Sequence, residues 1–167
     1  MTDLFMKSFA VFSPCRTWRY RLARFWGPGK TLNVIALNPS TADEKENDPT
    51  VTRLIIRAQH LGFDGLVVAN LFALRSTDPS SLYSHQDPIG PKNDDFILCQ
   101  ALECETVVCA WGNHGKLKQR GDAVKRMLRN AGIDLHAFKF TNAGEPSHPL
   151  YLSYKIAPKP WIDLEVT

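Results

Sequence analysis

Apolar residues along the chain follow two patterns that alternate: short continuous runs, which are typical of buried strands, and positions three or four apart, which are typical of helices. Residues 32–37 form a short, β-branched run that is typical of a buried strand, and the Asn38-Pro39-Ser40 that follows ends it because proline cannot continue a strand ladder. Over residues 49–61 apolar positions recur three and four apart after Asp48 as N-cap and proline at the first helical position, which predicts a helix ending at Gly62. The same reasoning predicts further strands at 66–69, 106–111 and 133–138 and helices at 93–105 and 121–131.

Strands and helices thus alternate from residue 32 to residue 138. This alternation favours right-handed crossovers, which place parallel strands side by side and helices on both faces of the sheet. The 167 residues are enough for one domain that buries a core without disulfide or metal support. We therefore predict a single domain over residues 1–167, with an α/β fold built as a three-layer α/β/α sandwich around a mostly parallel central sheet.

The first part of the chain has a different pattern. Charged and apolar residues are mixed over 16–25, which indicates an exposed or edge strand, and Gly27-Pro28-Gly29 ends it. The net charge is only +3, but residues 1–30 hold six Lys and Arg against one acid, and a second basic run lies between 113 and 139. We expect segment 1–30 to pack on the domain. Its charge can neutralise phosphates, although a solvated surface gives the same pattern, and both interpretations stay open.

Composition narrows the class of protein. With 44% hydrophobic and 22% charged residues, the chain is close to the globular average rather than to disordered or low-complexity sequences. Its apolar runs are far shorter than the ~20 residues that cross a bilayer, and the N-terminus lacks a signal-peptide layout, so we expect a cytoplasmic protein without membrane contact. The four cysteines lack zinc-site spacing, so we predict no metal, no cofactor and buried free thiols: Cys15, Cys99, Cys104 and Cys109.

Several motifs favour structural interpretations. Residues 27–31 resemble the end of a phosphate-binding P-loop, but the earlier glycine is missing and a strand follows instead of a helix. The acidic cluster at 43–48 could bind a divalent cation, but helix capping and solvation explain it more simply. No Gly-x-Ser-x-Gly elbow is present, so acyl-enzyme chemistry has no support.

Residues 75–91 form a long polar stretch with three prolines, which is typical of a binding segment.

Most of the candidate chemistry follows the predicted strands. Polar segments rich in glycine or proline occur at 38–40, 70–75, 111–115 and 141–152. The carboxyl ends of parallel strands meet at one edge of a sheet, and α/β proteins bind their ligands there. Of the five histidines, His114 and His148 lie in these segments, where an imidazole can donate a hydrogen bond or act as a general acid near neutral pH.

Taken in order, these segments resemble a known set of motifs in a bacterial and phage family of unknown function. The match extends over about residues 15–161 and includes Ala-Leu-Asn-Pro-Ser-Thr-Ala-Asp at 36–43, Asn-Asp-Pro-Thr at 47–50 with Arg53, Ala-Trp-Gly-Asn-His-Gly at 110–115 and Gly-Glu-Pro-Ser-His-Pro-Leu-Tyr at 144–151. The order is similar, more distantly, to the uracil-DNA glycosylase superfamily. The chain departs from that superfamily in having Leu37 in place of a glycine and His148-Pro149-Leu150-Tyr151 without a second Ser-Pro.

The more distant resemblance implies a uracil-DNA-glycosylase-like fold and hydrolysis of N-glycosidic bonds, which is base excision. Asn38 matches the residue that positions the attacking water, Asn70 the residue that reads the base edge, and His148 the residue that stabilises the departing base anion. The reaction needs such groups because positive charge develops on the sugar and negative charge on the base. We assign the following further residues to base or substrate binding: Pro39, Ser40, Phe72, Arg75, Trp111, His114, Leu150 and Tyr151.

Within this assignment, Leu150 with Tyr151 matches the wedge that fills the space of an everted nucleotide, and Phe72, Trp111 or Tyr83 would stack on the base. DNA or a nucleotide is the expected partner, with no obligate protein partner. The expected phosphate contacts are Arg19, Arg21, Lys30 and Lys116. Two alternatives stay open: a non-catalytic module that binds nucleic acid or modified bases, and a hydrolase or transferase of small nucleotides in which Lys30 or Arg75 holds a phosphate.

Overall fold

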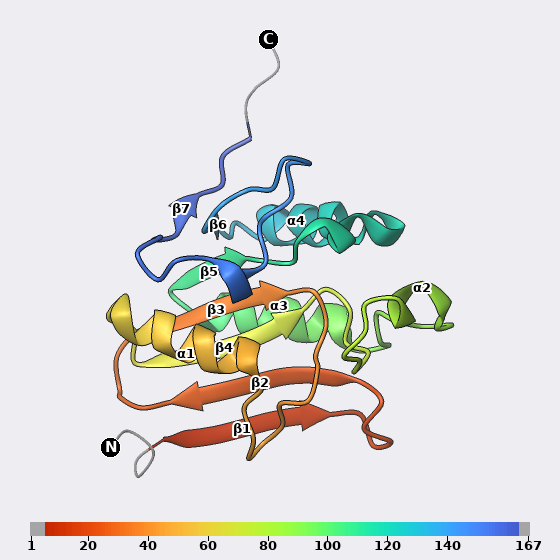
Figure 1. Ribbon diagram of the computed structural model, residues 1–167, viewed down its shortest axis with the longest axis horizontal. Helices are drawn as coiled ribbons and strands as arrows, with labels where there is room; N and C mark the ends of the chain where they lie inside the picture. Colours follow the sequence, from red (N-terminus) through yellow and green to blue (C-terminus); the bar gives the residue numbers. More distant parts are fainter. Residues whose placement is uncertain (1–5, 164–167) are drawn as a thin grey trace.

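The computed structural model describes residues 6–163, which form a seven-stranded sheet with helices on both faces (Figure 1). Its centre consists of four parallel strands: β3 (Thr31–Ala36), β4 (Gly65–Asn70), β5 (Thr106–Cys109) and β6 (Leu135–Ala137). Antiparallel strands flank this centre: β2 (Arg19–Phe25) and β1 (Lys7–Phe12) beyond β4, and β7 (Lys159–Pro160) beyond β6. In the order β1-β2-β4-β3-β5-β6-β7, antiparallel pairs are as frequent as parallel ones. The expectation of a mostly parallel sheet therefore holds only for the centre.

Three long helices cover the sheet and form the outer layers of the predicted sandwich. One layer is α1 (Pro49–His60), and the other consists of α3 (Asn93–Glu103) and α4 (Arg120–Asn130) on the opposite face (Figure 1). Shorter helices lie in the connections: α2 (Ser81–Ser84) and two 3₁₀ helices, η2 (Asn113–Gln119) and η3 (Pro149–Tyr151). Among the described residues, no helix has the length and apolar character needed to cross a membrane.

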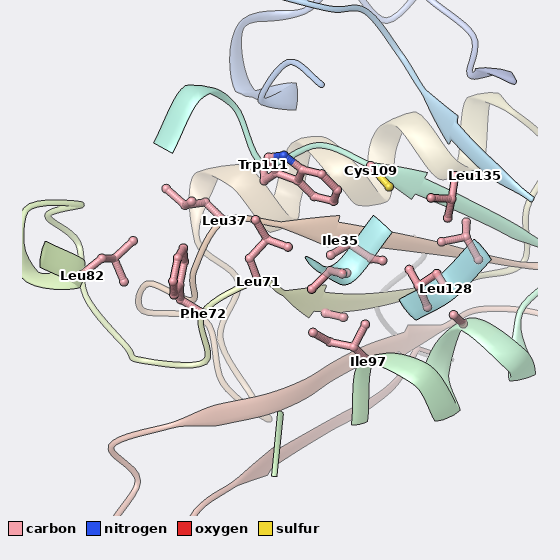
Figure 2. Close-up of a cluster of buried hydrophobic side chains, with 14 of the residues drawn as sticks. Ile35, Leu37, Leu71, Phe72, Leu82, Ile97, Cys109, Trp111, Leu128 and Leu135 are labelled. Atoms are coloured by element: carbon pink, nitrogen blue, oxygen red, sulfur yellow. The ribbon is translucent and has the colours of Figure 1, made fainter. Parts of the chain in front are cut away.

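Each face of the sheet carries its own hydrophobic cluster. On the α1 face, Val34 and Val68 of the sheet pack in one cluster with Leu54 of α1. On the other face, Ile35 of β3 lies in a second cluster with Ile97 of α3 and Leu128 of α4 (Figure 2). Because side chains of a strand point alternately to the two faces, the continuous apolar run of β3 supplies both clusters.

Helix α1 begins where the sequence predicts. The Oδ1 atom of Asp48 accepts a hydrogen bond from the backbone N–H of Val51 at 2.8 Å, and Pro49 takes the first helical position, where its missing N–H costs nothing. The apolar stripe Val51, Leu54, Ile55 and Ala58 is buried. The predicted cap and periodicity are thus confirmed for this helix.

Of the segment 1–30 that we expected to pack on the domain, residues 1–5 lie outside the described part, and the rest forms β1 and β2, two strands of the sheet itself. Strand β2 lies between β1 and β4, and five of its seven residues are buried, so the expectation of an exposed or edge strand is wrong. Two of its arginines, Arg19 and Arg24, are buried because oxygens of neighbouring loops accept their hydrogen bonds: Arg24 donates to Asn47 Oδ1 at 2.9 Å and to the carbonyl oxygens of Asp43 and Glu46. Strand β1 forms the edge instead.

The expectation of buried thiols holds only for Cys109, whose pKa is raised by burial. Cys15 and Cys99 are exposed, and Cys104 is partly buried with a pKa raised to about 12 by desolvation. The pKa of Cys15 is lowered to about 7, first by its hydrogen bond with Ser13 and then by that with Thr17. Exposure follows from position: Cys15 lies in the β1–β2 turn and Cys99 on the outer side of α3.

Candidate functional site

A cavity of about 40 Å³ lies where β3 and β4 end and β2 begins. Ala36 and Asn70 are register partners at the ends of the two parallel strands, so the residues after them leave the sheet at the same edge. The cavity is lined by Asn38, Asn70 and His148, which lie in three separate segments of the chain, and also by Arg19, Ser40 and Asp48. The three side chains expected to form the reaction centre therefore line one cavity.

Asn38 holds the turn after β3 in place through its amide nitrogen. Nδ2 donates to the carbonyl oxygens of Ser76 at 2.9 Å, Pro39 at 3.1 Å and Leu74 at 3.3 Å. Within residues 6–163, Oδ1 makes no hydrogen bond. The atom of Asn38 that stays available is therefore an acceptor, which can hold a water molecule but is too weak a base to remove its proton.

Asn70 has the opposite end of its amide available. Its Oδ1 accepts a hydrogen bond from Arg19 Nη2 at 3.3 Å, and its backbone oxygen accepts one from Asn93 Nδ2 at 2.9 Å. The Nδ2 atom makes no hydrogen bond to the described part of the chain, although only 3% of the residue is exposed. The bond with Arg19 therefore orients Asn70 as a hydrogen-bond donor to a ligand in the cavity.

Arg19 and Asp48 bring two charges to the cavity. Arg19 is 3% exposed and donates from Nη1 to the carbonyl oxygen of Ala42 at 3.0 Å. Burial lowers its pKa to about 10, against the opposing effect of Asp48, so the guanidinium stays charged at neutral pH. Asp48 is also buried, and beyond capping α1 it accepts from the N–H of Ala42 at 3.4 Å. The sequence interpretation of Asp48 as a cap is correct, but the same carboxylate also lines the cavity.

His148 enters the cavity from the segment that precedes η3. Its Nδ1 atom accepts from the N–H of Leu150 at 3.3 Å, so the neutral imidazole carries its proton on Nε2. Burial lowers the pKa of His148, and Asp48 opposes this effect. At neutral pH the side chain is therefore an uncharged hydrogen-bond donor through Nε2.

Two arginines of α1 hold the segment after His148 in place, and sequence reasoning missed their role. Arg57 is completely buried and donates to the carbonyl oxygens of Leu152 and Ser153, both at 2.8 Å. Arg53 donates to the same Leu152 oxygen at 2.9 Å. The one available signal was the position of Arg57 beside the apolar stripe of α1, where a charged residue needs buried acceptors.

Two expected stacking residues belong to the core. Phe72 is 0% exposed and Trp111 is 1% exposed, and both lie in the hydrophobic cluster on the α3 and α4 face (Figure 2). The indole N–H of Trp111 donates to Glu145 Oε2 at 2.8 Å. A Cβ atom on Gly115 would lie 2.1 Å from Cδ1 of this indole. The ring of Trp111 therefore occupies the inside of the turn that follows β5. Neither ring presents a face to a ligand, and assigning them to base stacking is incorrect.

The remaining predicted binding residues have different surroundings. Pro39 and Ser40 line the cavity, and Tyr151 is 90% exposed beside the partly buried Leu150. His114 lies outside the cavity, where its Nδ1 is 2.9 Å from the hydroxyl oxygen of Tyr83. This contact joins the turn after β5 to the segment 75–91.

The expected phosphate contacts do not form one surface. Arg19 is buried, and Arg21 pairs with Glu103 of α3 at 2.9 Å. Lys30 precedes β3, whereas the cavity follows it, and six strand residues separate these two edges by about 20 Å. Lys30 is therefore too far away to hold the phosphate of a small nucleotide that occupies the cavity. Lys116 is exposed in η2, which follows β5.

Two other arginines, the exposed Arg16 and the partly buried Arg75, lie next to the turn after β3. The guanidinium carbons of Arg16 and Arg75 lie over the ring of Phe12, at 3.8 Å and 4.7 Å from its centroid. Ser76, the neighbour of Arg75, donates its N–H to the carbonyl oxygen of Pro39. The expected Arg75 is therefore close to the site but does not line its cavity.

The acidic cluster provides capping and turn contacts. Asp43 Oδ1 accepts from the N–H groups of Lys45 and Glu46, both at 2.8 Å, and these bonds lower the pKa of Asp43. Glu44 pairs with Arg16 at 3.1 Å. Over residues 6–163, no three His, Cys, Asp or Glu side chains come together in a group that could hold a metal ion.

A larger cavity, of about 410 Å³, lies between the β1–β2 turn and the start of α3. Its walls are mainly apolar and include Val11, Trp18 and Phe96, while Ser13, Cys15 and Lys92 are its polar residues. Binding sites combine an apolar wall with convergent polar groups that orient the ligand. The small cavity has more such groups, and we therefore take it as the candidate site.

Comparison with curated proteins and with solved structures finds no match. A family model described as "Protein of unknown function (DUF1643)" matches residues 19–150. This match begins at Arg19 in β2 and extends to Leu150 after His148, so it includes all the residues named above as lining the cavity. The chain belongs to the DUF1643 family.

Proposed function

We propose that the chain is a nucleobase-recognising N-glycosidase that acts in the manner of a DNA glycosylase at the cavity after β3 and β4. The observation that supports this most is the arrangement of Asn38, Asn70 and His148 around one cavity. The proposal also uses the distant resemblance of the rim motifs to the uracil-DNA glycosylase superfamily, and with it a fold of that type.

The available atoms match what the reaction needs. Water attacks C1′ of the sugar, the C1′–N bond breaks, the sugar gains the hydroxyl group, and the base leaves with the electron pair and then takes a proton. Asn38 Oδ1 would accept a hydrogen bond from the attacking water. The Nε2–H of His148 and the Nδ2 of Asn70 would donate to the oxygen on which negative charge develops.

An uncharged His148 suits this role. Its pKa is lowered by burial, and the Leu150 N–H fixes the proton on Nε2, so the donor is present throughout the neutral pH range. The missing strong base at Asn38 favours a dissociative reaction in which the C1′–N bond is largely broken before water attacks. Hydrogen bonds to the leaving base then contribute most of the catalysis.

The size of the cavity requires movement on binding. About 40 Å³ holds a few water molecules, and a nucleobase needs more room. We expect the segment from Thr141 to Leu152 to shift outward when a base enters, with Tyr151 filling the space that the base leaves in the duplex. The exposed Arg16 and Lys116 and the partly exposed Arg75 would then contact backbone phosphates.

The test is excision from oligonucleotides that carry uracil or modified thymines, in duplex and single-stranded form, scored as abasic sites. The wild-type protein should release at least one base, and His148→Ala should lose about 10²–10³-fold in rate, as for removal of one donor to a developing anion. His60→Ala is the matched control, because this histidine is exposed at the end of α1 and lies outside the cavity. If no substrate yields abasic sites, or if His148→Ala keeps the full rate, the proposal fails.

A second candidate is a module that binds nucleic acid or a modified base without catalysis. The observation in its favour is the chemistry of Asn38, whose Nδ2 is fully engaged in the turn and whose Oδ1 cannot take a proton. Salt-dependent binding of the same oligonucleotides without base release would support this candidate.

A further inference from the structure

Arg19 is a buried cation without an acidic partner. Its guanidinium has five N–H donors, and it makes two hydrogen bonds, to the Ala42 carbonyl and to Asn70 Oδ1. Its Nε is buried and has no hydrogen-bond partner. Within residues 6–163, Arg19 forms no ion pair with a carboxylate. A charge that is removed from water and left in this state costs stability.

Other buried arginines of the protein are better satisfied. Arg24 donates to four carbonyl oxygens and to Asn47. Arg120 pairs with Asp94 at 2.6 Å. Arg57 also has an unbonded Nε, but it makes three hydrogen bonds to carbonyl oxygens and does not line the cavity. Arg19 therefore differs from them in combining unused donors with a position on a cavity wall.

No nearby carboxylate forms a direct ion pair with the guanidinium of Arg19, although the charge of Asp48 acts on it from a distance. Asp48 lines the same cavity, but its two oxygens accept from the backbone N–H groups of Val51 and Ala42. Asn70 presents a donor, because its oxygen is bonded to Arg19. His148 contributes a further donor from Nε2. The wall thus combines N–H donors from three side chains with the positive charge of Arg19 and with the carboxylate of Asp48, whose oxygens are already bonded to the backbone.

We propose that Arg19 and Asn70 form a subsite for one anionic oxygen group of the ligand, a phosphoryl or carboxylate group. A guanidinium beside an amide donor matches the paired oxygens of such a group. The volume of about 40 Å³ has room for a group of this size, with the rest of the ligand outside. This proposal does not rest on glycosidase activity, because anion binding and base release are separate measurements.

The first test measures thermal unfolding of the full chain with inorganic phosphate, a nucleoside monophosphate or acetate, at ionic strength held constant with potassium chloride. At least one of these anions should raise the melting temperature in a saturable way. A rise with phosphate, but not with acetate, assigns the subsite to phosphoryl groups, and the reverse assigns it to carboxylates. A rise with the nucleotide alone shows that the phosphoryl group binds as part of a larger ligand.

Two variants locate the effect. Asn70→Asp places a carboxylate next to Arg19 Nη2, where it competes with the ligand from inside the protein, and should weaken anion binding by at least about tenfold. Arg19→Gln should weaken it similarly by removing the charge. Arg126→Gln is the control, because this arginine is exposed on α4 and lies outside the cavity, and it should bind as the wild type does.

A spectroscopic measurement decides the case if both variants unfold. The guanidinium ¹⁵N resonances of Arg19 in the wild-type protein should shift on titration with the same anion. The proposal is overturned if no anion stabilises the wild type, if Asn70→Asp and Arg19→Gln bind as the wild type does, or if the Arg19 resonances stay unchanged while others move. Failure of base excision would leave each of these results intact.

Discussion

Three strand ends at the same edge of the sheet look alike in sequence but differ in structure. Asn38 lies in the turn after β3, Asn70 is the last residue of β4, and Trp111 and Gly115 lie in the turn after β5. The first two leave amide atoms unbonded next to a cavity, whereas the third is filled by its own indole ring. A polar turn at a strand end is therefore a candidate site only where some of its hydrogen-bonding groups are not already bonded to other parts of the protein.

The largest effect on stability is expected in the filled turn. Trp111→Ala should lower the free energy of unfolding by about 3–5 kcal/mol, because it leaves a large cavity in the core. It also removes the hydrogen bond that the Glu145 carboxylate accepts from the indole. Urea unfolding measures this loss. If the loss is below about 1 kcal/mol, Trp111 is not a core residue and the contrast between the turns disappears.

The glycine in the same turn should be the next most sensitive position. Gly115→Ala should cost about 1–3 kcal/mol, because the new Cβ would lie 2.1 Å from the indole of Trp111. Combining it with Trp111→Leu should cost less than the sum of the two single changes, since the smaller side chain relieves the overlap. Strict additivity would show that Gly115 is needed for some other reason.

The same amide-to-acid change should act differently at the two cavity asparagines. Asn38→Asp should lower stability by about 1–3 kcal/mol, because a carboxylate cannot donate to the carbonyl oxygens of Leu74 and Ser76. Asn70→Asp should leave stability unchanged or raise it, because the new charge faces Arg19. Equal losses at both positions, measured by urea unfolding, would contradict the hydrogen-bond assignment of the cavity.

The smallest effect is a pH dependence due to His148. Its pKa is below the ordinary value of 6.5, so the unfolded chain takes up a proton more readily than the folded one. The contribution of His148 to stability is therefore complete above this value and decreases as the pH falls below it. His148→Gln should unfold with a weaker pH dependence between about pH 8 and about pH 5 than the wild type. Identical profiles would mean that His148 titrates normally.

The parts of the fold that depend on local pattern could be predicted. The cap at Asp48, the stripe of α1 and the buried central strands follow from neighbouring residues alone. Strand β1 and the two-residue β7 were not predicted, because edge strands form by pairing with distant segments and β7 includes a proline.

Side-chain burial in the site was harder to predict than position. Asn38, Asn70 and His148 could be placed at one edge because strand ends converge there. The sequence could not distinguish the buried Arg19 from the exposed Arg16, since one-dimensional charge does not show whether loop carbonyls surround a guanidinium. Phe72 and Trp111 were assigned to base stacking because sequence does not show burial for them either: an aromatic residue after a strand can pack in the core or stack on a ligand.

The antiparallel insertion of β2 joins distant parts of the chain at the cavity. One wall comes from the start of β2, and another comes from the segment before η3, more than 120 residues later. A ligand that touches both walls would tie these two regions together, and its binding energy would be added to the barrier for local opening of either one. A bound ligand should therefore slow protease cleavage in the β1–β2 hairpin and in the segment before η3 by a similar factor.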